Sequence, residues 1–332
     1  MERSAPRRLG GSDLEITPLG LGTWAIGGRG PTAWGPQDDA DSVAAIRRAV
    51  ELGWNWIDTA PVYGLGHSER VVARALEGIP AADRPLVFTK VGLVWGWRKK
   101  VRHSLEPRSL RREVEASLRR LRVERLDLVQ IHWPALPKGA PSPGIEAAWE
   151  TLLGLQGEGK VRHLGVSNFS AEELGRVGAI APVVSNQPPY SMLMRQVERD
   201  PLPRCREAGI GVLAYSPMQN GLLTEKASRA WVEGLPENDW RRAGSPCFRE
   251  PLLSRVLELV EVLREVGRGR GAAVQEVALA WVLRDPVVTG AIAGARRPEQ
   301  VDGLAGAATL SLDPEELARI EAALPGDVEL FG

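Results

Sequence analysis

Four side chains that can hold or transfer a proton stand near the ends of short apolar runs of the sequence. Asp58, Lys90 and His132 each end such a run, and Tyr63 lies in a turn-prone segment just after Asp58. A carboxylate at the tip of a buried strand must be solvated, paired or functional, because burying an unpaired charge is costly. If these runs are parallel, neighbouring strands, the four side chains converge at one edge, where they could carry out acid–base chemistry.

Strands and helices that alternate along the chain must position these residues. The predicted strands are Leu19–Gly22, Trp54–Ile57, Val87–Lys90, Leu126–His132, Val161–Val166, Val183–Gln187, Gly211–Tyr215 and Val287–Ala293. Helical apolar patterns separate them, and such short spacings require a parallel sheet. The pattern predicts an α/β fold, a (β/α)8 TIM barrel, with its active site at the carboxyl ends of the strands. A doubly wound sheet is the alternative, but no Gly-x-Gly-x-x-Gly follows the first strand to support its dinucleotide-binding form.

Further segments extend this barrel, which we expect to form one domain over residues 1–332. A β-hairpin within residues 7–17 would close the far end of the barrel. The long loop Met218–Glu250 after the seventh strand exceeds what a barrel needs, which favours a functional role. Extra helices are predicted after strand seven, where Leu252–Val266 and Ala272–Leu283 are helical, and at the C-terminus over residues 314–324. The basic run Arg98–Arg102 is interpreted as a solvated loop.

Three motifs make the sequence similar to the aldo-keto reductases. They are Asn55–Ala60 with Tyr63-Gly64, then Thr89-Lys90, then Gln130–Pro134. The resemblance runs in order from about Leu9 to Leu324. It implies a (β/α)8 barrel, a nicotinamide cofactor, and a catalytic tetrad of Asp58, Tyr63, Lys90 and His132.

The chemistry of carbonyl reduction suits this tetrad. The reaction needs a hydride at carbon and a proton at oxygen, from a donor whose pKa is within reach of about pH 7. The pKa of tyrosine starts near ~10, and a nearby cation lowers it. We therefore assign Tyr63 as the general acid/base and Lys90 as the cation that lowers its pKa. Asp58 would keep Lys90 charged, and His132 would donate to the substrate carbonyl oxygen.

The resemblance also implies a cofactor site at the later strand ends. Polar side chains there suit a carboxamide, and Tyr215 suits stacking on a nicotinamide ring. Arg296 or Arg297 at the start of the last barrel helix could clamp a 2′-phosphate, which favours NADPH, with NADH possible. The expected cofactor contacts are Gly22, Thr23, Trp24, Asp58, Ser167, Asn168, Gln187, Tyr215, Ser216, Pro217, Met218, Gly221, Leu222, Gly294, Arg296, Arg297 and Gln300.

This last turn departs from a common pattern of the family, because Gly294-Ala295, Gln300 and Gly303-Leu304 replace residues that many members carry there. The phosphate contact would therefore depend on the arginines. The substrate pocket is predicted from the loop after strand seven and from four tryptophans, whose indoles make an apolar wall: Trp24, Trp34, Trp95 and Trp133. Trp149 and Trp281 lie within helical patterns and are assigned to the core.

Composition excludes several other classes. The 332 residues carry a formal net charge of +0, so the chain as a whole has no electrostatic attraction for nucleic acid or an anionic membrane. Cys205 and Cys247 form no disulfide framework, and no His/Asp cluster suits a metal-dependent hydrolase. No apolar run reaches roughly 18 residues, and the N-terminal stretch 1–8 lacks the apolar region of a secretory signal.

We therefore expect a cytoplasmic monomer or small homo-oligomer that reduces small carbonyl compounds and binds no metal. The alternative from another class is a nicotinamide-binding, redox-sensing regulatory subunit with slow turnover. Relatives of that kind keep the same tetrad, so the residues discriminate poorly between the two.

Overall fold

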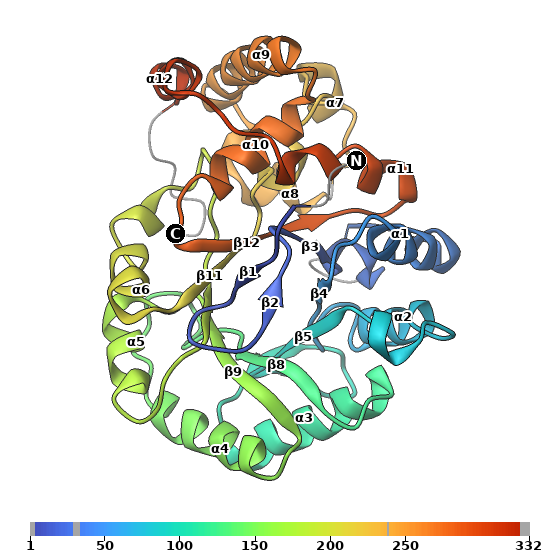
Figure 1. Ribbon diagram of the computed structural model, residues 1–332, viewed down its shortest axis with the longest axis vertical. Coiled ribbons are helices and arrows are strands. Elements are labelled where there is room, and N and C mark those ends of the chain that lie inside the picture. Colours follow the sequence, from blue (N-terminus) through green and yellow to red (C-terminus); the bar gives the residue numbers. More distant parts are fainter. Residues whose placement is uncertain (1–3, 29–33, 238, 326–332) are drawn as a thin grey trace.

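Eight parallel strands close into a barrel in the computed structural model, which describes residues 4–28, 34–237 and 239–325 (Figure 1). The strands follow one another round the barrel in chain order, and β12 pairs with β3 to close it. They are β3 (Leu19–Gly22), β4 (Trp56–Asp58), β5 (Leu86–Val91), β8 (Leu126–Ile131), β9 (Val161–Ser167), β10 (Ser185–Gln187), β11 (Gly211–Ala214) and β12 (Val288–Gly294). The predicted (β/α)8 barrel is confirmed.

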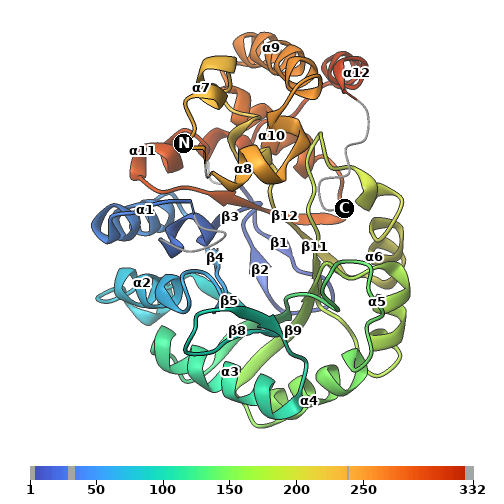
Figure 2. The same ribbon diagram turned by 180° about the vertical axis from the view of Figure 1, so that it is seen from behind.

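Helices surround the barrel in a ring, and further helices lie outside this ring (Figures 1 and 2). The ring contains α1 (Asp39–Glu51), α2 (His67–Ala75), α3 (Pro107–Leu121), α4 (Ile145–Gly157), α5 (Ala171–Gly178), α6 (Leu202–Ala208), α10 (Val274–Leu283) and α11 (Pro298–Asp302). The extra helices α9 (Leu252–Arg270) and α12 (Pro314–Ala323) pack against each other beyond α10. The long segment after β11 holds two short helices, α7 (Arg229–Glu233) and α8 (Trp240–Gly244).

The barrel interior is filled from one end by an aromatic plug. Trp56 is fully buried, packs on Phe88 with ring centroids 5.3 Å apart, and donates from Nε1 to the Thr17 carbonyl at 2.8 Å. The neighbouring strands leave room for this ring, because a Cβ at Gly20 would lie 2.1 Å from it and one at Gly290 2.7 Å from it. The glycines of β3 and β12 are thus required by the packing of Trp56.

The predicted N-terminal hairpin closes this end of the barrel, as expected. Its strands are β1 (Arg7–Arg8) and β2 (Glu15–Ile16), paired antiparallel. Leu9, Leu14 and Ile16 are fully or almost fully buried in the same cluster as Trp56. Figure 1 looks onto this hairpin, and Figure 2 looks from behind, onto the opposite end.

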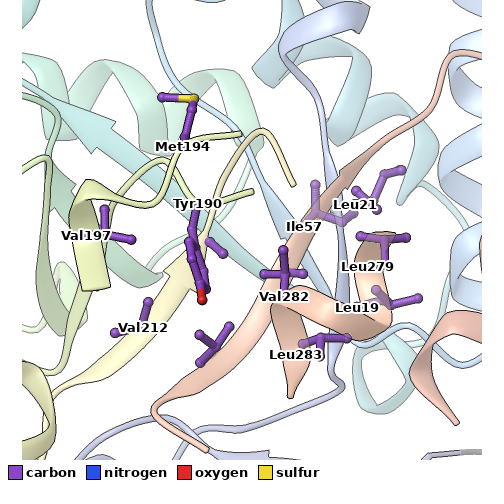
Figure 3. Close-up of a cluster of buried hydrophobic side chains, with 14 of the residues drawn as sticks. Leu19, Leu21, Ile57, Tyr190, Met194, Val197, Val212, Leu279, Val282 and Leu283 are labelled. Atoms are coloured by element: carbon purple, nitrogen blue, oxygen red, sulfur yellow. The ribbon is translucent and has the colours of Figure 1, made fainter. Parts of the chain in front are cut away.

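A second core fills the space between the barrel and its helices. Figure 3 shows part of it, in which outward-facing strand residues meet α10 and the segment after β10. The labelled side chains are Leu19, Leu21, Ile57, Tyr190, Met194, Val197, Val212, Leu279, Val282 and Leu283. Trp149 and Trp281 are fully buried, so their assignment to the core is confirmed.

One sequence prediction of local structure was wrong, and another was confirmed in part. The sequence also predicts one helix over 196–208, but the structure interrupts it, with a 3-10 turn at Gln196–Glu198 before α6. Pro201 lacks an amide proton and disfavours helical geometry at Asp200, which explains the break. The basic run interpreted as a solvated loop is confirmed over Arg98–Lys100, which form the exposed turn of an antiparallel hairpin. Val101 and Arg102 instead belong to its second strand. The strands of this hairpin are β6 (Leu93–Trp95) and β7 (Val101–His103).

Within the described residues, no helix is both long and apolar enough to cross a membrane. Residues 1–3 of the N-terminal stretch considered above lie outside the described part of the chain.

Candidate active site

The four predicted acid–base residues meet at the carboxyl end of the barrel. Asp58 ends β4 and Lys90 lies near the end of β5, and both are almost fully buried. Lys90 Nζ donates to Asp58 Oδ1 at 2.6 Å, to the Thr59 carbonyl at 3.1 Å and to the Tyr63 hydroxyl at 3.4 Å. His132 follows β8, and its ring meets that of Tyr63 edge-on with centroids 6.0 Å apart.

Close backbone packing fixes the turn that carries Tyr63. Gly64 has a φ of +61°, and a Cβ there would lie 1.9 Å from the Gly27 carbonyl oxygen. A Cβ at Gly27 would in turn lie 2.8 Å from the Gly64 nitrogen. The turn therefore rests directly on the 3-10 segment Trp24–Gly27, and both glycines are needed for the contact.

A set of amide side chains holds the tetrad from the next strands. Gln187 Nε2 donates to the second oxygen of Asp58 at 2.8 Å. Asn168 Nδ2 donates to the His132 carbonyl at 2.9 Å, and its Oδ1 accepts from the Tyr215 hydroxyl at 2.9 Å. Asn168 adopts a φ of +63°, which asparagine tolerates better than most residues. The tetrad is thus joined to the strand ends on which we expect the nicotinamide.

The pKa of Tyr63 departs from ordinary tyrosine in the direction opposite to our expectation. Burial raises this pKa well above 10.0, and the negative charge of Asp58 raises it further. Lys90 does not reverse the shift because its ammonium is paired with Asp58 at 2.6 Å. Burial likewise lowers the pKa of Lys90, and burial together with the charge of Lys90 lowers the pKa of His132 well below 6.5. The site therefore contains a protonated phenol and a neutral imidazole at neutral pH.

A cavity of 1770 Å³ opens above these side chains. All four tryptophans of the predicted substrate pocket line it, and so do most of the predicted cofactor contacts. The lining includes Gly22, Thr23, Trp24, Trp34, Asp58, Tyr63, Trp95, His132, Trp133, Ser167, Asn168, Gln187, Tyr215, Ser216, Pro217, Met218, Gly221, Gly294, Arg296 and Gln300. Lys90 lies beneath the lining and reaches the cavity through Tyr63.

Two predicted cofactor residues lie away from the cavity. Leu222 is fully buried in the hydrophobic core, and the side chain of Arg297 is 69% exposed and faces Asp41 at 3.6 Å. Arg296 does line the cavity, but its guanidinium also donates to the Gln37 side chain at 2.5 Å and to the carbonyls of Trp34 and Pro36. Arg296 therefore holds the segment 34–37 beside the site, a contact that sequence spacing could not reveal.

Sequence reasoning placed the long segment after β11 at the pocket but did not identify the individual residues that it contributes. Lys226, Trp240 and Arg241 all line the cavity. The Trp240 ring packs on Trp24 with centroids 5.2 Å apart, and the Arg241 guanidinium lies 4.9 Å from the centroid of Trp34. The unusual length of the segment was the only signal that pointed to it.

A cationic cluster lies at the end of the cavity lined by the segment after β11. It consists of Lys226, Arg241 and Arg296. Lys226 has no hydrogen-bonding or ion-pair partner among the described residues, and its ammonium lies over the Trp231 ring at 4.9 Å. Burial, Arg241 and Arg296 all lower the pKa of Lys226. Arg241 is paired with Asp239 at 2.7 Å, whereas Lys226 and Arg296 have no carboxylate partner among the described residues. The cluster therefore keeps positive charge that suits an anionic ligand. Across the described residues, no three His, Cys, Asp or Glu side chains are grouped to hold a metal ion.

A barrel of this topology, with a buried Lys–Asp pair under a tyrosine, defines a class of oxidoreductases. The chain belongs to the aldo/keto reductase family, whose sequence model matches residues 18–325. It is 36% identical over 316 residues to the aldo-keto reductase YhdN of Bacillus subtilis, covering 95% of this chain and 92% of that protein. It is 34% identical to the NADH-specific methylglyoxal reductase of Escherichia coli, covering 88% of this chain and 90% of that protein.

Solved structures agree with this assignment. The glycerol dehydrogenase AKR11B4 from Gluconobacter oxydans superposes with a TM-score of 0.86 at 38% identity, covering 99% of this chain and 98% of that one. The aldo-keto reductase AKR11C1 from Bacillus halodurans, in its holo form, superposes with a TM-score of 0.80 at 26% identity, covering 98% of each chain.

Proposed function

We propose that this protein reversibly reduces aldehydes or ketones to alcohols with a nicotinamide cofactor, preferring NADPH, and that Tyr63 is the general acid/base. The observation that carries the proposal is the ammonium of Lys90, buried beneath the cavity and 3.4 Å from the Tyr63 hydroxyl. Relatives named for methylglyoxal reduction and for glycerol dehydrogenation support a reaction between carbonyl and alcohol.

The raised pKa of Tyr63 suits the reduction direction. Its phenol keeps a proton at neutral pH and can donate it to an oxygen that becomes negative as the carbonyl is reduced. The phenolate left behind would face the Lys90 ammonium, which stabilises it more than it stabilises the phenol. Asp58 and the Thr59 carbonyl hold that ammonium in place. The neutral ring of His132 beside Tyr63 can donate to the same carbonyl oxygen and orient it.

The cavity residues fit a nicotinamide dinucleotide. When bound, the cofactor would supply the hydride. Gln187 uses its Nε2 on Asp58 and Gln130, which leaves its Oε1 to accept from a carboxamide. Tyr215 lines the cavity with its hydroxyl held by Asn168, so its ring can serve as a stacking surface. Lys226, Arg241 and Arg296 would hold phosphate groups, and their combined charge favours NADPH over NADH.

The test is Tyr63→Phe, assayed by NADPH consumption with a panel of aldehydes and ketones. We expect turnover to fall by more than about tenfold, since general acid catalysis is typically worth 10²–10⁴-fold. Affinity for NADPH should stay nearly unchanged because the hydroxyl acts on the substrate. The matched control is Tyr190→Phe, which removes a buried hydroxyl bonded to Glu198 at 2.7 Å and should keep full turnover.

Two results would overturn the proposal. A Tyr63→Phe enzyme with more than roughly a tenth of wild-type turnover would place the proton donor elsewhere. A wild-type protein that binds NADPH but reduces none of the panel would support the redox-sensing alternative instead.

A further inference from the structure

The hairpin of β6 and β7 carries a basic tip at the mouth of the cavity. Arg98, Lys99 and Lys100 form this tip and line the cavity, together with Arg70 of α2. All four side chains are exposed, and none has a hydrogen bond or ion pair within the described part of the chain. Each therefore keeps its donors and its charge available to a ligand.

The carboxylates of the cavity do not neutralise this tip. Among the described residues, the acidic side chains of its lining are Asp58, Glu225 and Glu299. Asp58 is paired with Lys90, and the other two belong to the segments that follow β11 and β12. With a net charge of +0 over the whole chain, the four cations are a local excess at the mouth, set there by the hairpin and α2.

The basic tip stands across the barrel from the cluster that suits the cofactor phosphates. The hairpin follows β5, whereas Lys226 and Arg241 follow β11, and these two strands lie on opposite sides of the ring (Figure 2). A single binding site for the cofactor phosphates therefore does not account for both groups of cations. The tip instead belongs to the part of the cavity that is left for the substrate.

The wall between the tetrad and the tip is continuous. Leu93, Trp95 and Val101 of the hairpin line the cavity, and His103 Nε2 is hydrogen bonded to the Trp133 carbonyl at 2.9 Å. Trp97 continues this apolar wall outward: its side chain is 86% exposed, and the Arg98 guanidinium lies 4.6 Å from its ring centroid. A substrate with its carbonyl at Tyr63 would run along this wall and end at the tip.

We propose that the enzyme selects carbonyl substrates that carry an anionic group, a carboxylate or a phosphate, remote from the carbonyl. Arg98, Lys99, Lys100 and Arg70 would bind the anion, and Trp97 would cover the apolar body between the two groups. The proposal extends the function proposed above and depends on it. It makes the basic tip a determinant of specificity and gives it no part in the proton transfer.

The test compares three benzaldehydes that differ only in the para substituent: a carboxylate, a phosphate ester and a neutral methyl ester. The tip variant R98A/K99A/K100A is assayed for kcat/KM at saturating NADPH and low ionic strength. Arg102→Ala is the matched control, because Arg102 is an exposed cation of the same hairpin that does not line the cavity.

We expect the tip variant to lose about tenfold in kcat/KM for the two anionic aldehydes, since an exposed charge contact is worth up to about fivefold. The neutral ester should change by less than about twofold, and so should all three substrates with Arg102→Ala. Added salt should reduce the wild-type rates with the anions only, because it screens exposed charges. The larger of the two anionic losses would tell whether carboxylate or phosphate is preferred.

Equal losses on all three substrates, or none, would overturn the proposal. So would an equal loss with Arg102→Ala, which would mean that the general field of the surface selects the substrate. If the wild type reduced none of the three aldehydes or any other carbonyl, the proposed function itself would fail, and this inference with it.

Discussion

Glu113 should make the stability of the protein depend on pH near neutrality. This residue of α3 accepts from the Gly92 amide at 2.9 Å and from the Ser109 hydroxyl at 3.2 Å, at the base of the β6–β7 hairpin. Burial raises its pKa from 4.5 to about 7. The folded chain therefore keeps this proton at a pH at which the unfolded chain has lost it. Stability falls as the pH rises from about 4.5 to about 7, and the loss is complete above that range.

The size of the effect follows from these two pKa values. Between about pH 5 and about pH 8, ionisation of Glu113 should cost the folded state roughly 2.5 kcal/mol relative to the unfolded chain. Glu113→Gln removes this cost and keeps an oxygen for the Gly92 amide. The difference in unfolding free energy between the variant and the wild type should therefore shift in favour of the variant by roughly 2–3 kcal/mol between about pH 5 and about pH 8.

Urea unfolding followed by tryptophan fluorescence, at both pH values and on both proteins, measures this difference. Glu115→Gln is the matched control on the same helix, because the side chain of Glu115 is 37% exposed and accepts from Lys160 at 2.8 Å. That ion pair lowers the pKa of Glu115, so the ionised carboxylate stabilises the folded state. Glu115→Gln should therefore lower the stability slightly at the higher pH, whereas Glu113→Gln should raise it. A difference between Glu113→Gln and the wild type that does not change with pH would refute the reasoning.

Three more changes test other parts of the structure. Lys90→Met should lower turnover and shift the pH profile of the remaining activity upward, because the Tyr63 phenolate loses its cation; an active enzyme with an unshifted profile would contradict this role. Lys226→Met should weaken NADPH binding by about tenfold, as loss of one charged hydrogen bond implies. Arg297→Ala should leave NADPH binding unchanged, because Arg297 does not line the cavity and faces Asp41; parallel fluorescence titrations measure both affinities. Gly20→Ala should destabilise the barrel by roughly 1–3 kcal/mol, seen as a lower thermal midpoint, because the new Cβ would meet the ring of Trp56.

The tetrad could be predicted from the sequence because the patterns that identify its residues are local. Each of Asp58, Lys90 and His132 ends an apolar run, and parallel strands bring their carboxyl ends to one edge whatever the loops do. The closure of β12 onto β3 follows from the same repeat of strand and helix. The exposed turn at Arg98–Lys100 was likewise predicted from its run of charged residues, whereas the strands β6 and β7 on either side of it are too short to give a clear pattern.

Other features depend on contacts that no local pattern encodes. Arg296 donates to the segment 34–37, far away in the sequence, so its role could not be inferred from its place at a helix start. Lys226 and Arg241 come from a segment with only short helices, whose path depends on packing against Trp24 and Trp34. The direction of the Tyr63 pKa shift depends on how much of the hydroxyl is buried and on how fully Lys90 is paired, and both are properties of the folded site.

The contrast between Lys90 and the basic tip indicates which side chains of the cavity can be substituted without loss of stability. Lys90 is almost fully buried with its ammonium on Asp58, and removing either partner leaves an uncompensated charge in the core, which is costly. Arg98, Lys99 and Lys100 are exposed and unpaired within the described residues, and substitutions at such surface positions usually change stability by only about ±0.5 kcal/mol. The tip variant should therefore fold like the wild type, and a loss of activity toward anionic substrates can be assigned to the missing charges.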